Sequence, residues 1–128
     1  MNKNKILLAD DDAALRRLLC EQLTPHGYEL EEAENGAEAI EKLQKTEYNL
    51  LLLDITMPVL TGWDVLQFIS EKGLTCPVIM LTGMGSLYNV VKSARDGADE
   101  YITKPYDVND LLCAIQRVLK KPKSLTDI

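Results

Sequence analysis

A set of carboxylate, hydroxyl, lysine and glycine residues stands directly after the short apolar runs of this sequence. In chain order they are Asp10, Asp11, Asp12, Asp54, Thr82, Gly83 and Lys104. Carboxylates that are held close together repel one another, and they either take up protons or collect a cation. Oxygen ligands with room for water suit Mg²⁺, and a lysine beside a threonine hydroxyl suits a phosphoryl group. These residue types predict a magnesium-dependent phosphoryl-transfer site, provided that the fold brings them together.

Asp54 is the candidate nucleophile of that chemistry. It follows three leucines in the stretch LLLDITMP, which lacks the alternation of a half-exposed strand and is typical of a strand buried on both faces. A charge at the end of such a strand is unfavourable unless it is paired. Asp54 could cap a turn before Pro58, but the polar residues after the other strands favour the formation of an aspartyl phosphate.

The elements that must position these residues alternate between strands and helices. Strands are predicted over 5–9, 28–33, 48–54, 77–83 and 100–103, and helices over 12–23, from Gly36, and over 63–72, 86–95 and 108–120. The first helix should bury one face, made of Leu15, Leu18, Leu19 and Leu23. Five such β-α units favour one α/β domain with a parallel sheet covered by helices on both sides. Ligands bind such sheets beyond the carboxyl ends of the strands.

Composition narrows the class of protein. A chain of 128 residues suits one domain, and a net charge of −6 argues against direct nucleic-acid binding. No apolar run approaches the length that a membrane span needs. Three widely spaced cysteines without a CxxC pair (Cys20, Cys76 and Cys113) suit free thiols in a reducing cytoplasm. We therefore expect a cytoplasmic domain over 1–121, followed by a polar tail or the start of a linker over 122–128.

The chain resembles a receiver domain of two-component response regulators from about Lys5 to Lys120. The matching segments are ILLADDD, LLLDITMP with the glycine that follows, VIMLTG and GADEYITKPY. The resemblance, which includes chemotaxis regulators, implies a flavodoxin-like, doubly wound fold with strand order 2-1-3-4-5 and five helices. It also implies a phosphorylation-activated switch that receives its phosphoryl group from a sensor histidine kinase or a histidine phosphotransfer protein.

The resemblance assigns the metal and the acceptor. Asp54 would accept the phosphoryl group and also bind Mg²⁺. Asp11 would be a direct Mg²⁺ ligand, with Asp10 supporting it, often through water. Thr56 would offer only its backbone carbonyl to the metal. Asp12 would cap the helix that follows.

The resemblance also assigns the cradle and the switch. Lys104 and Thr82 would bind phosphoryl oxygens, and the backbone N–H groups of Ile55 and Gly83 would complete the cradle. The Lys104-Pro105 bond resembles the cis peptide of the family. Tyr101 matches the aromatic residue that turns inward when the threonine moves.

The output that the resemblance implies is a changed surface around the fourth helix, fifth strand and fifth helix, which controls an output domain or partner. Ala114 and Gln116 stand where relatives that dimerise through this surface carry basic residues, so we expect a monomer in isolation. The protein would catalyse its own phosphorylation and slow autodephosphorylation, as a signalling protein rather than a turnover enzyme. Thr56 and Met84 would flank the path of the attacking water.

Some alternatives and assignments stay open. A haloacid-dehalogenase-like phosphatase could use Asp10 as its nucleophile, although no late acidic pair is present for its metal. A receiver-like module that is never phosphorylated is the other alternative. Arg16, Arg17 and Glu21 of the first helix are either contacts for the kinase or part of a solvated helix face.

Overall fold

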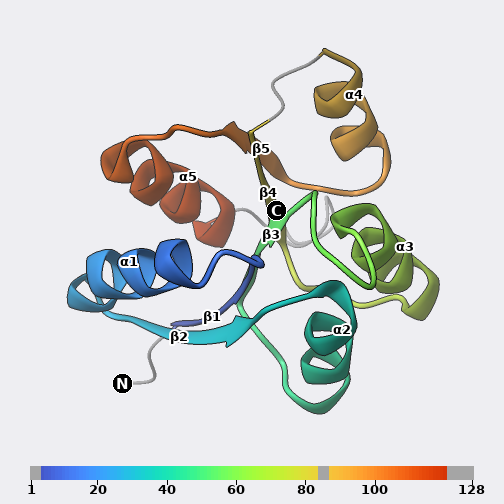
Figure 1. Cartoon of the computed structure of the whole chain (residues 1–128), viewed down its shortest axis with the longest axis horizontal. Coiled ribbons are helices and arrows are strands. Elements are labelled where there is room, and N and C mark those ends of the chain that lie inside the picture. Colours follow the sequence, from blue (N-terminus) through green and yellow to red (C-terminus); the bar gives the residue numbers. More distant parts are fainter. Residues whose placement is uncertain (1–3, 84–86, 121–128) are drawn as a thin grey trace.

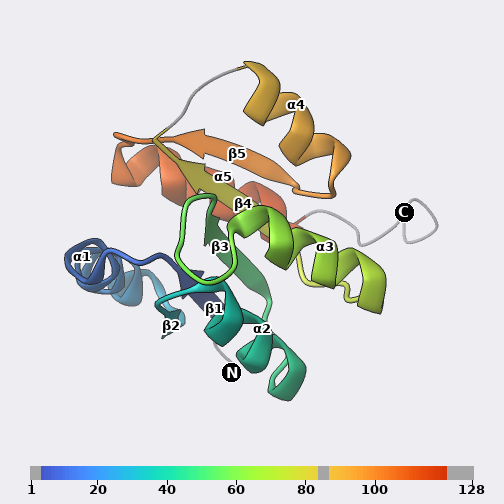
Figure 2. The same ribbon diagram turned by 45° about the vertical axis from the view of Figure 1, so that its right-hand side comes forward.

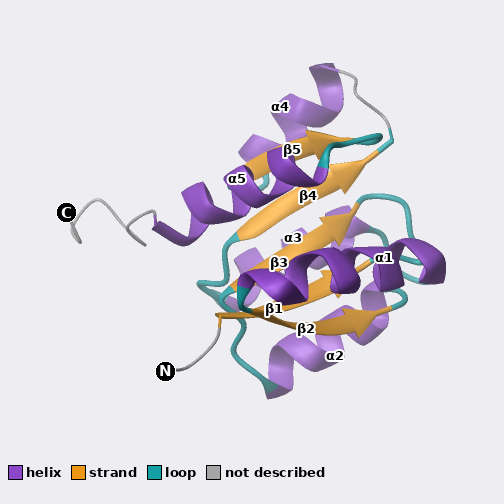
Figure 3. Ribbon diagram, turned by 90° about the vertical axis from the view of Figure 1, so that its left-hand side faces the viewer, coloured by secondary structure: helices purple, strands orange, loops and turns teal. Residues whose placement is uncertain are grey.

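The protein forms one five-stranded parallel sheet with the strand order β2-β1-β3-β4-β5. The structure is a computed structural model and describes residues 4–83 and 87–120. The strands are β1 (Asn4–Ala9), β2 (Tyr28–Ala33), β3 (Leu50–Asp54), β4 (Val78–Thr82) and β5 (Glu100–Thr103). All neighbouring pairs are parallel, so the carboxyl ends of the strands lie along one edge of the sheet (Figure 3).

Helices cover both faces of this sheet. They are α1 (Ala13–Leu23), α2 (Gly36–Lys45), α3 (Gly62–Lys72), α4 (Leu87–Arg95) and α5 (Val108–Lys120), with a short 3₁₀ turn, Thr24–His26, after α1. Helices α1 and α5 lie on one face of the sheet (Figure 1). Helices α2, α3 and α4 follow one another along the other face (Figure 2).

The central strand β3 explains the unbroken leucine run of the sequence. All five of its residues are buried. Leu51 and Leu53 pack into the core under α2 and α3, whereas Leu50 and Leu52 pack into the core under α1 and α5. Both faces of the strand are covered, so there is no face on which a polar residue would be favoured. The prediction of a doubly buried strand is confirmed.

The predicted elements agree with the structure except at their ends and at one helix face. The predicted strand 48–54 begins two residues later, at Leu50. Tyr48 and Asn49 belong to the loop between α2 and β3. In α1, Leu19 and Leu23 are buried, but Leu18 is 48% exposed. The prediction that Leu18 shares the buried face was therefore wrong. Within the described part of the chain, no helix has the length and apolar character that a membrane span requires.

Candidate functional site

The register of the sheet brings the predicted polar residues to one place. Ala9 of β1 lies beside Leu53 of β3, so the next residues, Asp10 and Asp54, lie side by side at the carboxyl ends of the two strands. Asp54 pairs with Leu81 of β4, one residue before Thr82. Thr82 in turn pairs with the last residue of β5, directly before Lys104. The carboxyl ends of four strands thus converge on one site.

Three carboxylates form the floor and rim of this site. Ligand oxygens of Asp10, Asp11 and Asp54 all lie within 4.8 Å of one another. Asp10 is fully buried and Asp54 is 6% exposed, whereas Asp11 is exposed to solvent. Buried carboxylates at this spacing repel one another, and an all-oxygen set that opens to water at one ligand fits a hard divalent cation such as Mg²⁺.

Lys104 supplies the opposing charge. Its Nζ lies 3.0 Å from Asp10 Oδ2 and 3.8 Å from Asp54 Oδ2. Its backbone N–H donates to the Thr82 carbonyl at 2.6 Å, which places the lysine just past the last rung of β4 and β5. The Lys104-Pro105 peptide is cis, as the resemblance implied. The ammonium is therefore held over the gap between the two buried carboxylates.

The electrostatics of Asp54 follow from this arrangement. Burial, and next the charge of Asp10, raise the pKa of the Asp54 carboxyl from 3.8 to about 6. Lys104 and a hydrogen bond from the backbone N–H of Thr56 lower this pKa, but by less. The site therefore holds excess negative charge near neutral pH, which a bound cation would offset.

Asp10 and Asp12 shape the turn between β1 and α1. Asp10 Oδ1 accepts the Asp12 N–H at 2.9 Å, while its Oδ2 binds Lys104. The Asp12 side chain accepts the N–H of Leu15 at 3.1 Å and caps α1. The prediction that Asp12 is a helix cap is confirmed, and Asp10 has both carboxylate oxygens engaged by the protein.

Thr82 and Tyr101 are already connected. Thr82 is buried at the end of β4, and Tyr101 is partly buried on β5. Burial raises the pKa of the Tyr101 hydroxyl, while hydrogen bonds with Thr82 and with Asn89 of α4 lower it. A movement of the Thr82 side chain would therefore be felt at Tyr101 and, through Asn89, at α4.

The backbone cradle differs in part from the predicted one. Ile55 N–H donates to the Leu81 carbonyl at 3.3 Å, so it is engaged in the sheet and would have to exchange this partner to reach a phosphoryl oxygen. Thr56, whose side chain is exposed, is the residue whose N–H reaches the Asp54 carboxylate, a donor that the sequence reasoning missed. Gly83 is exposed at the rim.

Two further residues of the site belong to the matching segments of the sequence, but no role was assigned to them there. A Cβ on Gly62 would lie 2.4 Å from the Asp54 carbonyl oxygen, so only glycine lets α3 begin against the end of β3. The buried Tyr106 hydroxyl has no hydrogen-bond partner among the described residues. Burial, and next the charges of Asp10 and Asp54, raise the pKa of Tyr106 to about 12. In the sequence, Gly62 is the glycine that follows LLLDITMP, and Tyr106 is the last residue of GADEYITKPY.

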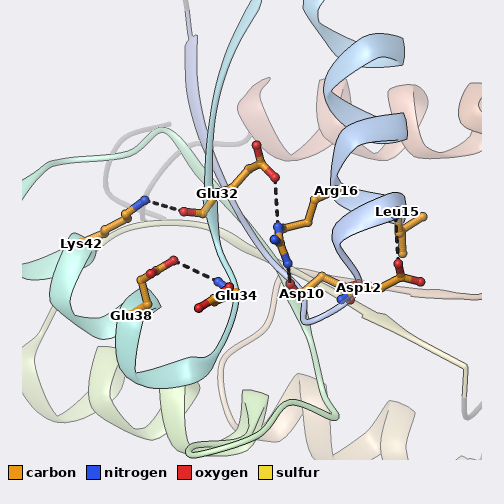
Figure 4. A network of polar contacts seen from close by, with 8 residues as sticks. All are labelled: Asp10, Asp12, Leu15, Arg16, Glu32, Glu34, Glu38 and Lys42. Atoms are coloured by element: carbon orange, nitrogen blue, oxygen red, sulfur yellow. Dashed lines mark hydrogen bonds and ion pairs between the residues drawn. The ribbon is translucent and has the colours of Figure 1, made fainter.

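The candidate surface residues of α1 divide into two kinds. Arg17 and Glu21 are exposed, as a solvated face or a partner contact requires. The Arg16 side chain is only 12% exposed and bonds within the molecule (Figure 4). Met84, expected to flank the water path, lies outside the described residues.

Comparison with protein families decides what this arrangement is. Residues 6–116 match the model of the response regulator receiver domain. The chain belongs to that family. It is the receiver domain of a two-component response regulator, and the predicted 2-1-3-4-5 fold is confirmed.

Sequence relatives of this receiver include transcriptional regulators. The chain is 42% identical over 120 residues to the transcriptional regulatory protein ResD of Bacillus subtilis, covering 94% of this chain and 50% of ResD. It is 37% identical over 123 residues to SrrA of Staphylococcus aureus, covering 96% of this chain and 51% of SrrA. The chain thus spans about half the length of the curated relatives that it matches.

Solved structures agree closely with the receiver. A CheY-like receiver domain from Methanospirillum hungatei superposes with a TM-score of 0.87 at 36% identity, covering 92% of this chain and 94% of that chain. The response regulator TrrA of Thermotoga maritima, in complex with Mg²⁺-BeF, gives a TM-score of 0.81 at 35% identity, covering 90% and 98%. Neither the haloacid-dehalogenase-like alternative nor the interaction-module alternative receives support from these comparisons.

Proposed function

We propose that this receiver takes a phosphoryl group onto Asp54 from the phosphohistidine of a sensor histidine kinase or of a histidine phosphotransfer protein. The observation that carries the proposal is the Asp54 carboxylate, buried at the end of β3, with Lys104 Nζ 3.8 Å away and two further carboxylates within 4.8 Å. A nucleophile on the central strand is held still, and positioning is the main contribution of a protein to phosphoryl transfer.

The transfer needs few covalent changes. A carboxylate oxygen of Asp54 forms a bond to phosphorus, and the P–N bond of the phosphohistidine breaks, with its electron pair leaving on the imidazole. Lys104 and Thr82 are placed to bind the phosphoryl oxygens as negative charge spreads over them. The N–H groups of Gly83, Thr56 and, after leaving Leu81, Ile55 are the candidate backbone donors.

The residues of the site fit a Mg²⁺ ion. Asp11, Asp54 and the Thr56 backbone carbonyl would hold it, with Asp10 contributing through water because its own oxygens bind Asp12 and Lys104. Mg²⁺, when bound, would neutralise charge on the carboxylates and on the transferring oxygens. The Mg²⁺-BeF complex of TrrA, which is 35% identical to this chain, supports the assignment.

The proposed output is a change in the surface of α4, β5 and α5. The hydrogen bonds that join Tyr101 to Thr82 and to Asn89 supply a route from the phosphoryl group to α4. Exposed Tyr88 and Val91 on α4 offer apolar contacts to an output domain or downstream protein.

We also propose a receiver over 1–121 with a tail or linker over 122–128, acting in the cytoplasm without direct contact to nucleic acid or membrane. The tail lies outside the described residues.

The proposed lifetime of the phosphoryl group is long. The hydrolytic water must approach in line, opposite the Asp54 oxygen. Thr56 at that approach is short, and Met84 offers no useful hydrogen bond to water. The Asp11 carboxylate would bind the metal, and both Asp10 oxygens are engaged by Asp12 and Lys104, so neither carboxylate is available as a general base. We expect slow autodephosphorylation, with reset by an outside phosphatase or by the kinase.

Labelling with acetyl phosphate tests the proposed function. The wild-type protein should gain one phosphoryl group in intact-mass spectra when Mg²⁺ is present and none in EDTA. Asp54→Asn should abolish the label, and Asp11→Asn should slow it. Asp64→Asn is the matched control, because Asp64 is an exposed aspartate in the first turn of α3, and it should label normally. An unlabelled wild-type protein, or a labelled Asp54→Asn protein, would refute the assignment.

A further inference from the structure

Arg16 is an arginine of α1 that turns back toward the metal end of β1. Its Nη1 donates to the backbone carbonyl of Asp10, and its Nε donates to Glu32 Oε1 of β2 at 2.9 Å (Figure 4). The Arg16 side chain is 12% exposed and that of Glu32 is 46% exposed. The Arg16 side chain is therefore bonded within the molecule at two points, although Arg16 was a candidate contact for the kinase.

The carbonyl that Arg16 binds belongs to the peptide that joins Asp10 to Asp11. The Asp10 N–H donates to the Ala33 carbonyl at 3.1 Å, directly after the last residue pair of β1 and β2. The Asp10 carbonyl comes after this bond in the chain. That carbonyl belongs to the planar Asp10-Asp11 peptide, so anchoring its oxygen fixes the plane and the position of the Asp11 Cα. Asp11 is the exposed carboxylate of the cluster, and none of the described residues bonds to its side chain.

Glu32 orients the guanidinium of Arg16. The guanidinium is a rigid planar fork, so holding Nε on the Glu32 carboxylate aims Nη1. The Glu32 backbone is itself held, because Lys42 of α2 donates its Nζ to the Glu32 carbonyl (Figure 4). The edge strand β2 and helix α2 thus support the turn that carries the metal ligands.

We propose that Arg16, oriented by Glu32, is a positioning residue for the Mg²⁺ site. It fixes the Asp10-Asp11 peptide so that the Asp11 carboxylate points into the cluster before the ion arrives. The proposal rests on the proposed function, since that function supplies the Mg²⁺. It does not require Arg16 to touch the ion, and it assigns Arg16 an internal role that a kinase contact would not need.

Charge and position predict opposite effects at this residue. A positive charge beside a carboxylate cluster disfavours a cation, so an account based on charge alone predicts tighter Mg²⁺ binding when Arg16 is removed. The positioning account predicts weaker binding. It also predicts selectivity, because Mg²⁺ demands near-octahedral geometry at short distances whereas Ca²⁺ accepts flexible ligands. A loosened turn should therefore penalise Mg²⁺ more than Ca²⁺.

Titration calorimetry with MgCl₂ and with CaCl₂ on the unphosphorylated protein tests the proposal. The variants are Arg16→Gln, Arg16→Lys and Glu32→Gln. A lysine keeps the charge but cannot donate to both partners as a fork. The matched controls are Arg17→Gln, an exposed arginine beside Arg16, and Glu29→Gln, an exposed carboxylate on the same strand. Circular dichroism confirms that each variant is folded at the titration temperature.

We expect each of the three variants to raise the Kd for Mg²⁺ by about tenfold, in the range seen when the support of a metal ligand is removed. The Kd for Ca²⁺ should rise less, and the controls should stay near wild type for both ions. Tighter Mg²⁺ binding in Arg16→Gln, unchanged Mg²⁺ affinity, or equal losses for the two ions would overturn the proposal while leaving the proposed function intact. A wild-type protein that binds no Mg²⁺ would overturn both.

Discussion

At the scale of single residues, the Asp54 carboxylate is held where its charge is unfavourable until a cation or phosphoryl group arrives. Burial and Asp10 raise its pKa to about 6, and Lys104 offsets only part of this effect. Binding of Mg²⁺ would relieve this repulsion, and this gain does not depend on which molecule donates the phosphoryl group. The same repulsion makes the unligated site a source of instability.

Asp54→Asn should therefore stabilise the metal-free protein at neutral pH. Between 3.8 and about 6 the folded state holds a proton at Asp54 that the unfolded chain has released. Wild-type stability consequently falls as the pH rises through this window, and the loss persists above it. A shift of about two pKa units corresponds to about 3 kcal/mol, so we expect asparagine to raise the free energy of unfolding by about 2 kcal/mol.

Urea denaturation in EDTA at several pH values measures this effect. The advantage of Asp54→Asn should grow from acid toward pH 6 and then level off. Asp12→Asn exchanges an exposed carboxylate in the neighbouring turn for another good helix cap and should show little change. A stability gain at Asp54 that is the same at every pH would contradict the electrostatic explanation.

At the scale of elements, the close approach of α3 to β3 fixes the loop that follows Asp54. Gly62→Ala would place a Cβ 2.4 Å from the Asp54 carbonyl oxygen, which is backbone and cannot move without shifting the strand. We expect a loss of about 1–3 kcal/mol in the free energy of unfolding, as for other overpacked sites. Gly83→Ala, with nothing within 4 Å of its Cβ, is the control and should unfold like wild type. Equal stability of the two variants in urea would contradict the proposed packing constraint.

The link between Thr82, Tyr101 and Asn89 should carry the switch. When Mg²⁺ and beryllofluoride are added, amide NMR shifts should extend from the Asp54 loop into α4 and β5. Tyr101→Phe keeps the ring but removes the hydroxyl that bonds to Thr82 and Asn89, so the shifts in α4 should shrink while those near Asp54 remain. A ligand shifts the balance between two conformations only when it binds one of them more tightly than the other. Wild-type shifts confined to the loop after Asp54 would therefore count against this mechanism.

The elements and the site differ in how far the sequence could predict them. The helix 108–120 matches the structure because its apolar stripe is the face that it buries. Asp54 and Lys104 could be placed because polar residues at the ends of parallel strands must meet. The exposure of Leu18 and the bonds of Arg16 could not be, because they depend on which neighbour lies across from α1. Hydrophobic periodicity identifies the apolar face of a helix but not the elements that pack against it.

At the scale of the whole molecule, two pairs of opposite charges on the α4-β5-α5 surface are formed within the chain. Arg117 donates twice to Glu100, at 3.0 Å each, and Lys92 binds Asp96 at 2.8 Å. Lys92 Nζ also lies 4.9 Å from the centre of the Trp63 ring. Charges that are already engaged contribute little to a symmetric dimer, and exposed pairs are weak singly.

We therefore expect the receiver to sediment as a monomer, both free and with Mg²⁺ and beryllofluoride. Ala114 of α5 is buried and offers no charge to a partner. Sedimentation velocity over a range of concentrations measures this directly. A tight symmetric dimer that forms on activation, and that Arg117→Ala abolishes, would contradict the expectation.

The central claim is that Asp54 itself becomes the acyl phosphate, and trapping that bond with borohydride tests it most directly. Borohydride reduces an aspartyl phosphate to homoserine, which marks the position permanently in a peptide. After incubation with acetyl phosphate and Mg²⁺, tandem mass spectrometry should find homoserine at position 54 and at none of the neighbouring aspartates. Homoserine at position 10 or 11, or its absence from the whole chain, would contradict the account.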